Sequence, residues 1–133
     1  GHSIPSIGLG TWELRGQECR RVVREALELG YRHIDTAAMY ENESEVGSGI
    51  IDSRVDREEV FLTAKINTTG WTPSGGHGPL LQNKTIIKSF EKSLFDLKTD
   101  YVDLLLLSSN HENDLYRNIY RHTMTMKYRK LNP

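Results

Sequence analysis

Apolar and polar positions along the first 110 residues follow two alternating patterns, one typical of strands and one typical of helices. Short apolar runs predict four β-strands, at residues 7–12, 31–37, 60–65 and 101–107. Apolar residues spaced three and four apart predict three helices between them, at residues 17–29, from Ser44 onward, and after Asn83. Strict alternation of this kind predicts an α/β fold with a parallel sheet and right-handed crossovers. The order of the elements fits both an open doubly wound sheet and part of a (β/α)8 barrel.

The helical spacing also predicts which side chains are buried. The expected apolar positions are Cys19, Val22, Val23, Ala26 and Leu27 in the first helix, Val46, Ile50 and Ile51 in the second, and Ile86, Ile87, Phe90, Leu94 and Leu97 in the third. Gly30 follows the first helix, where a C-terminal cap favours positive φ, and Ser44 is a suitable N-cap for the second. The last strand carries apolar residues on both of its faces, which predicts a strand covered on two sides.

The charge of the chain changes sign near residue 110. Residues 111–133 contain five Lys or Arg against two acidic residues, a net charge of +3, whereas the whole chain carries −1. We therefore predict an α/β part at residues 1–110 and a helical or irregular extension at residues 111–133. A stretch rich in Gly, Thr and Pro at residues 67–82 predicts a long loop within the first part.

Composition argues against several classes of protein. With 37% hydrophobic and 26% charged residues the chain is typical of a globular protein, and its near-neutral charge argues against a nucleic-acid binder. No apolar run approaches the ~20 residues of a membrane span, and the first residues lack the pattern of a secretory signal. The single cysteine, Cys19, is expected to be an inert core thiol in a reducing, cytoplasmic setting. The five histidines have no metal-ligand spacing, so we expect no metal site.

Polar side chains occur at the carboxyl ends of the predicted strands, where parallel α/β enzymes build their sites. Asp35 lies late in the second strand, Tyr40 follows in the next loop, and Lys65 ends the third strand. The three converge if the second and third strands are neighbours. An ammonium beside a phenol favours the phenolate, and a carboxylate orients the ammonium. Each residue alone is more often an ordinary surface or ion-pair residue, but together they are suited to protonating an oxygen that becomes an alkoxide.

The sequence around these residues resembles a known family. Residues 30–47, GYRHIDTAAMYENESEVG, look like the signature of the aldo-keto reductases. Residues 4–12 (IPSIGLGTW) are similar to the first strand of that family, residues 61–65 (FLTAK) to the strand that bears its catalytic lysine, and residues 100–107 (DYVDLLLL) to its fourth strand. The resemblance covers residues 4–107 in four blocks in the right order. It implies a partial (β/α)8 TIM barrel with about four parallel strands and flanking helices.

The resemblance also implies a reaction, in which an aldehyde or ketone is reduced by hydride transfer from NADPH, with NADH as a possible substitute. Tyr40 would donate the proton, Lys65 would assist it by its positive charge, and Asp35 would pair with Lys65. The implied cofactor-binding residues in this part of the chain are Gly10, Thr11, Trp12 and Asp35. For Trp12, an aromatic wall of the pocket and an ordinary core position are equally good interpretations. The implied partner is a small carbonyl substrate, with no nucleic acid and no membrane.

The sequence departs from the family pattern after the fourth strand. The family has a catalytic histidine directly after this strand, and here Ser108 stands in its place, which implies a loss of rate of about 10²–10⁴. Ser109 and Asn110, together with residues 131–133, resemble the sixth strand–helix unit of the family. On that interpretation the chain has an internal deletion, and Ser109 and Asn110 would be ligands of the nicotinamide carboxamide. An unrelated tail is the alternative.

The 133 residues amount to about half of the ~250 residues of a complete barrel. We therefore expect a truncated or internally deleted protein whose open sheet edges favour self-association or marginal stability. Two classes of function remain open. One is a carbonyl reductase with impaired activity, and the other is a non-catalytic barrel remnant that acts as an interaction module or has no independent function. NADPH binding by the purified chain discriminates between them.

Overall fold

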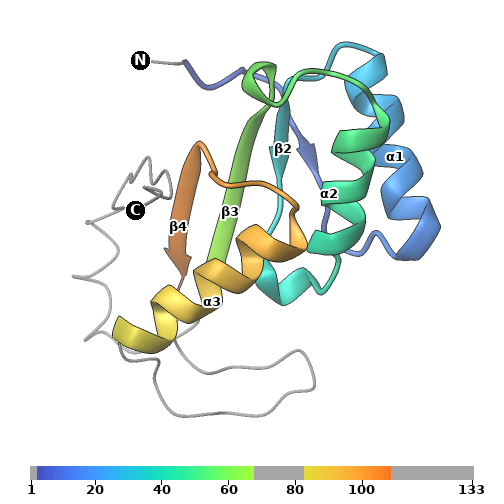
Figure 1. Cartoon of the computed structure of the whole chain (residues 1–133). Helices are drawn as coiled ribbons and strands as arrows, with labels where there is room; N and C mark the ends of the chain where they lie inside the picture. The colour runs from blue at the N-terminus through green and yellow to red at the C-terminus, as the bar shows by residue number, and fades with distance from the viewer. Residues whose placement is uncertain (1–2, 68–82, 109–133) are drawn as a thin grey trace.

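The structure is a computed structural model that describes residues 3–67 and 83–108. Its elements in chain order are β1 (Leu9–Gly10), α1 (Gly16–Glu28), β2 (His33–Asp35), the 3-10 helix η1 (Ala38–Tyr40), α2 (Glu43–Asp52), the 3-10 helix η2 (Arg57–Glu59), β3 (Phe61–Asn67), α3 (Asn83–Asp96) and β4 (Leu104–Ser108) (Figure 1). All four predicted strands and all three predicted helices are present in the predicted order. The predicted loop after Asn67, the extension at residues 111–133 with its boundary, and the candidate ligands Ser109 and Asn110 lie outside the described residues.

The four strands form one parallel sheet in the order β1-β2-β3-β4. Buried side chains of all three helices pack with those of β2 and β3 in one core, so the three helices lie on the same face of the sheet. Right-handed crossovers between strands whose order never reverses give this arrangement. A doubly wound sheet instead reverses its order and carries helices on both faces. The structure therefore resolves the two alternatives in favour of part of a (β/α)8 barrel.

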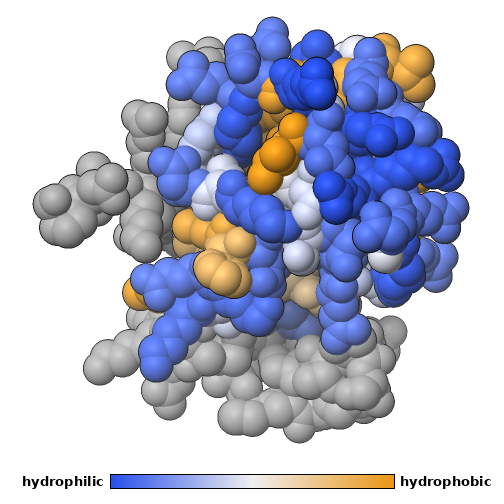
Figure 2. All heavy atoms as spheres, turned by 45° about the vertical axis from the view of Figure 1, so that its right-hand side comes forward, coloured by the Kyte–Doolittle hydropathy of each residue, from blue (hydrophilic) through white to orange (hydrophobic). Residues whose placement is uncertain are grey.

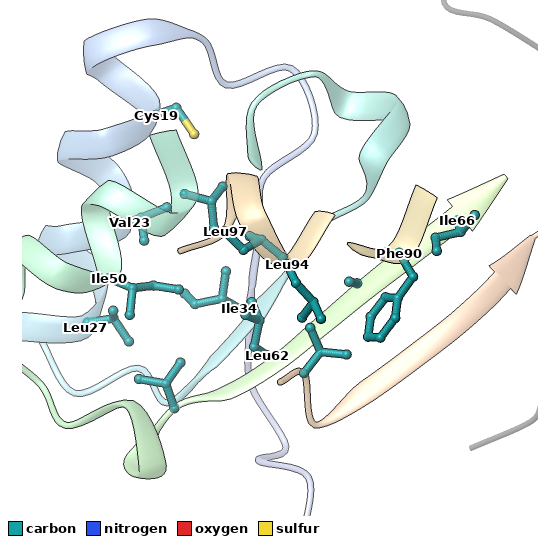
Figure 3. Close-up of a cluster of buried hydrophobic side chains, with 14 residues drawn as sticks. Cys19, Val23, Leu27, Ile34, Ile50, Leu62, Ile66, Phe90, Leu94 and Leu97 are labelled. Atoms are coloured by element: carbon teal, nitrogen blue, oxygen red, sulfur yellow. The ribbon is translucent and has the colours of Figure 1, made fainter. Parts of the chain in front are cut away.

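The hydrophobic core lies between the sheet and the helices. From the sheet, Ile34 of β2 and Leu62, Ala64 and Ile66 of β3 are fully or almost fully buried. The helix side chains packed against them are Cys19, Val23, Leu27, Val46, Ile50, Phe90 and Leu94, with Leu97 following α3 (Figure 3). Lys65 and Asn67 alternate along β3 with the buried Ala64 and Ile66, so they lie on the opposite face of the sheet, which is where the candidate site lies.

The thiol of Cys19 is part of this core, as predicted. It is fully buried on α1. Burial raises the pKa of Cys19 to about 11, Glu45 adds to the rise, and Arg15 opposes it. Because the thiolate is the reactive form of cysteine, this thiol is inert in the folded protein.

Strand β1 contains only two of the six residues predicted for it. The Leu14 N–H donates to the Thr11 carbonyl at 3.2 Å, and Glu13 has a φ of 64°, so the chain turns directly after Gly10. The apolar pattern carries no information about this turn. Strand β3, in contrast, continues two residues beyond the predicted end at Lys65.

Four predicted details of burial and capping are wrong. Ile51 is 59% exposed and Ile87 is 58% exposed, because each lies about 100° around its helix from a neighbour that faces the core. The N-cap of α2 is Asn42 rather than Ser44, which is already helical and exposed. Leu107 of β4 is 48% exposed, although it pairs with the buried Ile66 and shares its face, because it lies near the end of the last strand in the described sheet.

The surface seen in Figure 2 is largely hydrophilic and is interrupted by separate hydrophobic patches.

Gly30 follows α1 with a φ of 103°, which confirms its predicted role at the helix end. Within the described part of the chain, the helices are too short or too polar to cross a membrane.

A cluster of charged and aromatic side chains fixes β4 beside β3 at the amino ends of these strands. The Asp103 carboxylate accepts the Leu62 N–H at 2.9 Å and pairs with Arg57 at 3.1 Å. The Arg57 guanidinium also donates to the Tyr101 carbonyl at 2.9 Å and lies 4.1 Å from the centre of the Tyr101 ring. These bonds set the register in which Lys65 of β3 pairs with Leu106 of β4.

Helix α2 is held tightly between α1 and α3 by two glycines. A Cβ atom on Gly47 would lie 2.5 Å from the Leu97 carbonyl oxygen, and one on Gly49 would lie 2.6 Å from the Arg20 carbonyl oxygen. Both neighbours are backbone atoms, which cannot move away as a flexible side chain can. The position of α2, and with it the loop that bears Tyr40, therefore depends on the absence of side chains at these two positions.

Gly47→Ala is expected to lower the free energy of unfolding by about 1–3 kcal/mol, because the new methyl group must push α2 away from Leu97. Ser44→Ala is the matched control, since it lies on the same helix with an exposed side chain. Urea unfolding of both variants measures the effect. Equal stabilities of the two variants would contradict the close approach of α2 and α3.

The first residue of α2 is a buried acid. Glu43 is 6% exposed. Burial raises the pKa of Glu43 to about 7, opposed by the nearby Ser93 hydroxyl, while Asp96 adds to the rise and Lys92 opposes it. The folded protein therefore holds this proton more tightly than the unfolded chain does.

We expect a pH dependence of stability from Glu43. Its protonated form contributes stability that is fully present below about pH 4.5 and is lost as the pH rises to about 7. Glu43→Gln is therefore expected to raise the free energy of unfolding at about pH 8 by up to roughly 3 kcal/mol, and to have little effect at about pH 4.5. Denaturant unfolding across this pH range measures the difference, with the exposed Glu59→Gln as control. A constant difference between Glu43→Gln and the wild type across the range would disprove the assignment.

Candidate active site

Three of the predicted site residues meet at the carboxyl ends of β2 and β3. The Lys65 ammonium donates to the Asp35 carboxylate and, at 3.2 Å, to the hydroxyl oxygen of Tyr40. Its nitrogen lies 5.1 Å from the centre of the Tyr40 ring. The predicted convergence of Asp35, Tyr40 and Lys65 is therefore present in the structure.

The register of the sheet explains why Asp35 and Lys65 meet. Asp35 ends β2 and pairs with Thr63 of β3, and Lys65 is two residues further along the same strand. Side chains two apart on a strand point to the same face. The Lys65 side chain therefore projects beside Asp35, on the face of the sheet opposite to the helices.

Tyr40 reaches the same point from the loop after β2. It ends η1, in which the Tyr40 N–H donates to the Ala37 carbonyl at 3.0 Å. Glu41 follows with a φ of 55° in the left-handed region, which reverses the chain before α2 begins. This tight connection directs the phenol back over the sheet end and toward Lys65.

The bonds among these groups determine what each can do. Lys65 and Asp35 are partly buried, with side chains 22% and 33% exposed, and neutralise each other. Because the ammonium donates to the Tyr40 oxygen, the phenol can use its own O–H to donate to another group. The ammonium also lies next to the oxygen on which the negative charge remains after the proton has left. The arrangement can thus deliver a proton to an oxygen that becomes negative.

Two of the predicted cofactor-binding residues, Gly10 and Thr11, lie at the end of β1. Thr11 is fully buried, and its hydroxyl donates to Thr36 Oγ1 at 2.9 Å, so its side chain is engaged within the fold. A Cβ atom on Gly10 would meet no atom within 4 Å. Gly10 pairs with Asp35 in the sheet, so the space next to this glycine opens on the same face as the Asp35 side chain.

Trp12 lies beside the phenol rather than in the core. It is 51% exposed, and its ring centre is 4.9 Å from that of Tyr40 with an angle of 64° between the two planes. This edge-to-face contact gives the site an aromatic side. The interpretation of Trp12 as an ordinary core residue is therefore wrong, whereas its contact with a cofactor or substrate stays a prediction.

A further residue at the site, Asn42, was not singled out by sequence reasoning. It is almost completely buried, and its side-chain amide donates to the Thr11 carbonyl at 2.8 Å and to the Leu14 carbonyl at 2.9 Å. Its position two residues after Tyr40 is the only sequence signal, because asparagine is ordinarily an exposed residue. The structure thus joins the loop that bears Tyr40 to the turn that bears Trp12.

The position that the family resemblance assigns to a histidine lies at the end of β4. Ser108 pairs there with Asn67, two residues beyond the pairing of Lys65 with Leu106. Its correspondence with the family histidine stays a prediction. In the described parts of the chain, no group of three or more His, Cys, Asp or Glu side chains is placed to hold a metal ion.

Comparison with known proteins gives consistent results. The family model described as "Aldo/keto reductase family" matches residues 6–128. The methylglyoxal reductase DkgB of Yersinia pestis is 45% identical over 112 residues, which are 84% of this chain and 38% of that protein.

Solved structures show the same relationship. An aldo/keto reductase from Brucella melitensis superposes with a TM-score of 0.72 at 38% identity, covering 91% of this chain and 43% of the other. The Bombyx mori aldo-keto reductase in complex with NADP superposes with a TM-score of 0.67 at 36% identity, covering 80% and 35%. The chain thus spans well under half the length of these relatives, and its sheet corresponds to part of their (β/α)8 barrels. The family match and the shared barrel segment together establish that the chain belongs to the aldo/keto reductase family.

Proposed function

We propose that the protein is an NADPH-dependent reductase of aldehydes or ketones, with NADH as a possible alternative cofactor. The observation that carries the proposal is the Lys65 ammonium bonded at once to the Asp35 carboxylate and the Tyr40 hydroxyl. This set of groups is suited to donating one proton at a fixed point beside an aromatic surface. Reduction of a carbonyl group to an alcohol requires such a proton at the oxygen.

In the proposed reaction, Tyr40 gives its proton to the carbonyl oxygen of the substrate as a hydride reaches the carbonyl carbon. The C=O double bond becomes a C–O single bond, and the product is an alcohol. Lys65 stabilises the phenolate that Tyr40 becomes, and Asp35 keeps Lys65 in place and offsets its charge. Water restores the proton to Tyr40 after the product leaves.

A nicotinamide cofactor fits the residues present at the site. The open space beside Gly10 lies on the face that carries Asp35 and Lys65, and the half-exposed Trp12 ring lies against Tyr40. When bound, the reduced nicotinamide supplies the hydride. We assign its binding to Gly10, Trp12 and Asp35, together with Ser109 and Asn110, whereas the fully buried Thr11 supports the end of β1 from within the fold. A solved relative in complex with NADP supports the choice of cofactor.

The first substrate to test follows from one relative. The relative from Yersinia pestis is named a methylglyoxal reductase. We therefore choose methylglyoxal as the first carbonyl compound to test.

The test is NADPH oxidation by the purified chain in the presence of methylglyoxal. Tyr40→Phe is expected to lower the rate by about 10²–10⁴-fold, because it removes the proton donor and keeps the ring. Tyr31→Phe is the matched control, since this tyrosine is exposed and lies outside the site. A wild-type rate in Tyr40→Phe would disprove the assignment of the proton donor. The absence of both turnover and NADPH-induced fluorescence quenching in the wild type would favour a non-catalytic role instead.

A second prediction concerns Ser108, which occupies the place of the family histidine. An imidazole there would help to orient the carbonyl oxygen, so Ser108→His is expected to raise kcat by up to about 10²-fold. Ser108→Ala, which adds no such group, is the control and is expected to leave the rate nearly unchanged. If Ser108→His does not exceed Ser108→Ala in rate, the correspondence of Ser108 with the histidine is wrong.

A further inference from the structure

We propose that Asn42 is a positioning residue that holds Trp12 against Tyr40 and so sets the shape of the site around the proton donor. The catalytic part of this inference rests on the proposed function, whereas the positioning itself is a property of the fold. Asn42 lies beyond η1 and before α2, and it touches neither the Tyr40 hydroxyl nor Lys65 by a hydrogen bond of its own.

The bonds of Asn42 are specific in direction. Its amide nitrogen has two N–H donors, and they are used on the Thr11 and Leu14 carbonyls at 2.8 and 2.9 Å. Both partners are acceptors, so the amide nitrogen rather than the amide oxygen must face them. The side chain is only 1% exposed, which means that water does not replace these bonds if they are lost.

The two acceptors are the ends of one turn. The Thr11 carbonyl accepts the Leu14 N–H at 3.2 Å as well as the Asn42 amide, and Glu13 within the turn has a φ of 64°. A non-glycine residue in the left-handed region is unfavourable and persists only when its surroundings hold it. Asn42 contacts both sides of the turn and is therefore well placed to hold it.

Thr11 is anchored more firmly than the residues that follow it. The Thr11 N–H donates to the Asp35 carbonyl at 3.0 Å, and the Thr11 hydroxyl donates to Thr36. Leu14 is partly buried against the core, whereas Trp12 between them is held by its edge-to-face contact with Tyr40 and by the turn that Asn42 bonds at both ends. Loss of the amide is therefore expected to release Trp12 while Thr11 and the end of β1 stay in place.

The consequence for the site follows from sequence proximity. Asn42 is two residues from Tyr40, so the same residue ties the loop of the proton donor to the turn of its aromatic neighbour. On this proposal, the bonds of Asn42 keep the Trp12 and Tyr40 rings in contact, with their centres 4.9 Å apart. A displaced Trp12 would leave Tyr40, Lys65 and Asp35 intact but would no longer orient a carbonyl compound over the phenol.

The experiment uses Trp12 as its own reporter. The chain has two tryptophans, and Trp71→Phe leaves Trp12 as the single one. In this background, acrylamide quenching of fluorescence is measured for the parent, for Asn42→Ala and for Ser53→Ala. Ser53 is the matched control, because it is buried at the opposite end of α2 and also makes two hydrogen bonds, donating to the Ile50 carbonyl and accepting the Val55 N–H.

The expected result is a quenching constant that rises up to about twofold in Asn42→Ala, since the ring begins at 51% exposure, and that is unchanged in Ser53→Ala. An unchanged constant in Asn42→Ala, or an equal rise in both variants, would overturn the inference. Circular dichroism checks that each variant is folded. If Asn42→Ala is not, the same comparison is made with Asn42→Ser, which keeps a single donor and is expected to show a smaller rise.

Activity provides a second and separable measurement. Asn42→Ala is expected to lower kcat/KM by roughly 10- to 100-fold, and to have little further effect once Trp12→Ala is present, because both changes remove the same wall. Additive losses would show that Asn42 affects the rate independently of Trp12 and would overturn this part of the inference. If the wild type has no NADPH-dependent turnover, the proposed function fails, and the quenching experiment still decides the role of Asn42.

Discussion

The bond from Lys65 to both Asp35 and Tyr40 sets the requirements for the rest of the described structure. A partly buried ammonium is stabilised by a nearby carboxylate, and here the neighbouring strand β2 places Asp35 beside it. The contact between Asp35 and Lys65 depends on the register of β2 against β3, in which Asp35 pairs with Thr63. The cluster of Arg57, Tyr101 and Asp103 at the other end of the sheet aligns β4 with β3 instead. Charged groups therefore fix the sheet at both of its ends, and each group joins a different pair of strands.

The helices contribute to the site in a different way. They bury the apolar face of the sheet and leave the polar face free, so the residues of the core and those of the site alternate along the same strand, as Ala64 and Lys65 do. Helix α2 has the most constrained position, because Gly47 and Gly49 allow it to approach α3 and α1. The tyrosine loop is attached directly to this helix, so its place above the sheet is inherited from helix packing.

Local patterns in the sequence predicted the strand–helix order and the trio of Asp35, Tyr40 and Lys65. The order of strands and helices is predictable because hydrophobic periodicity is a local property of the sequence. The position of the three residues is predictable because the carboxyl ends of parallel strands meet at one edge of the sheet. The choice between barrel and open sheet needed the resemblance to a family, because strand order is a long-range property. The turn at residues 11–14 and the burial of Asn42 could not be predicted, because they depend on contacts between residues about 30 positions apart. The exposed Ile51 and Ile87 show that helical periodicity predicts which side of a helix faces the core but not how far around the helix the buried surface extends.

The buried thiol of Cys19 has a practical consequence. It is the single cysteine of the chain and lies where α1 packs against α2 and the sheet. Reagents that modify thiols react with the thiolate, which burial disfavours here, and they also need physical access. The rate at which such a reagent labels the folded protein therefore measures how often α1 separates from its neighbours. Cys19 is therefore a built-in probe of how fast the core around α1 opens.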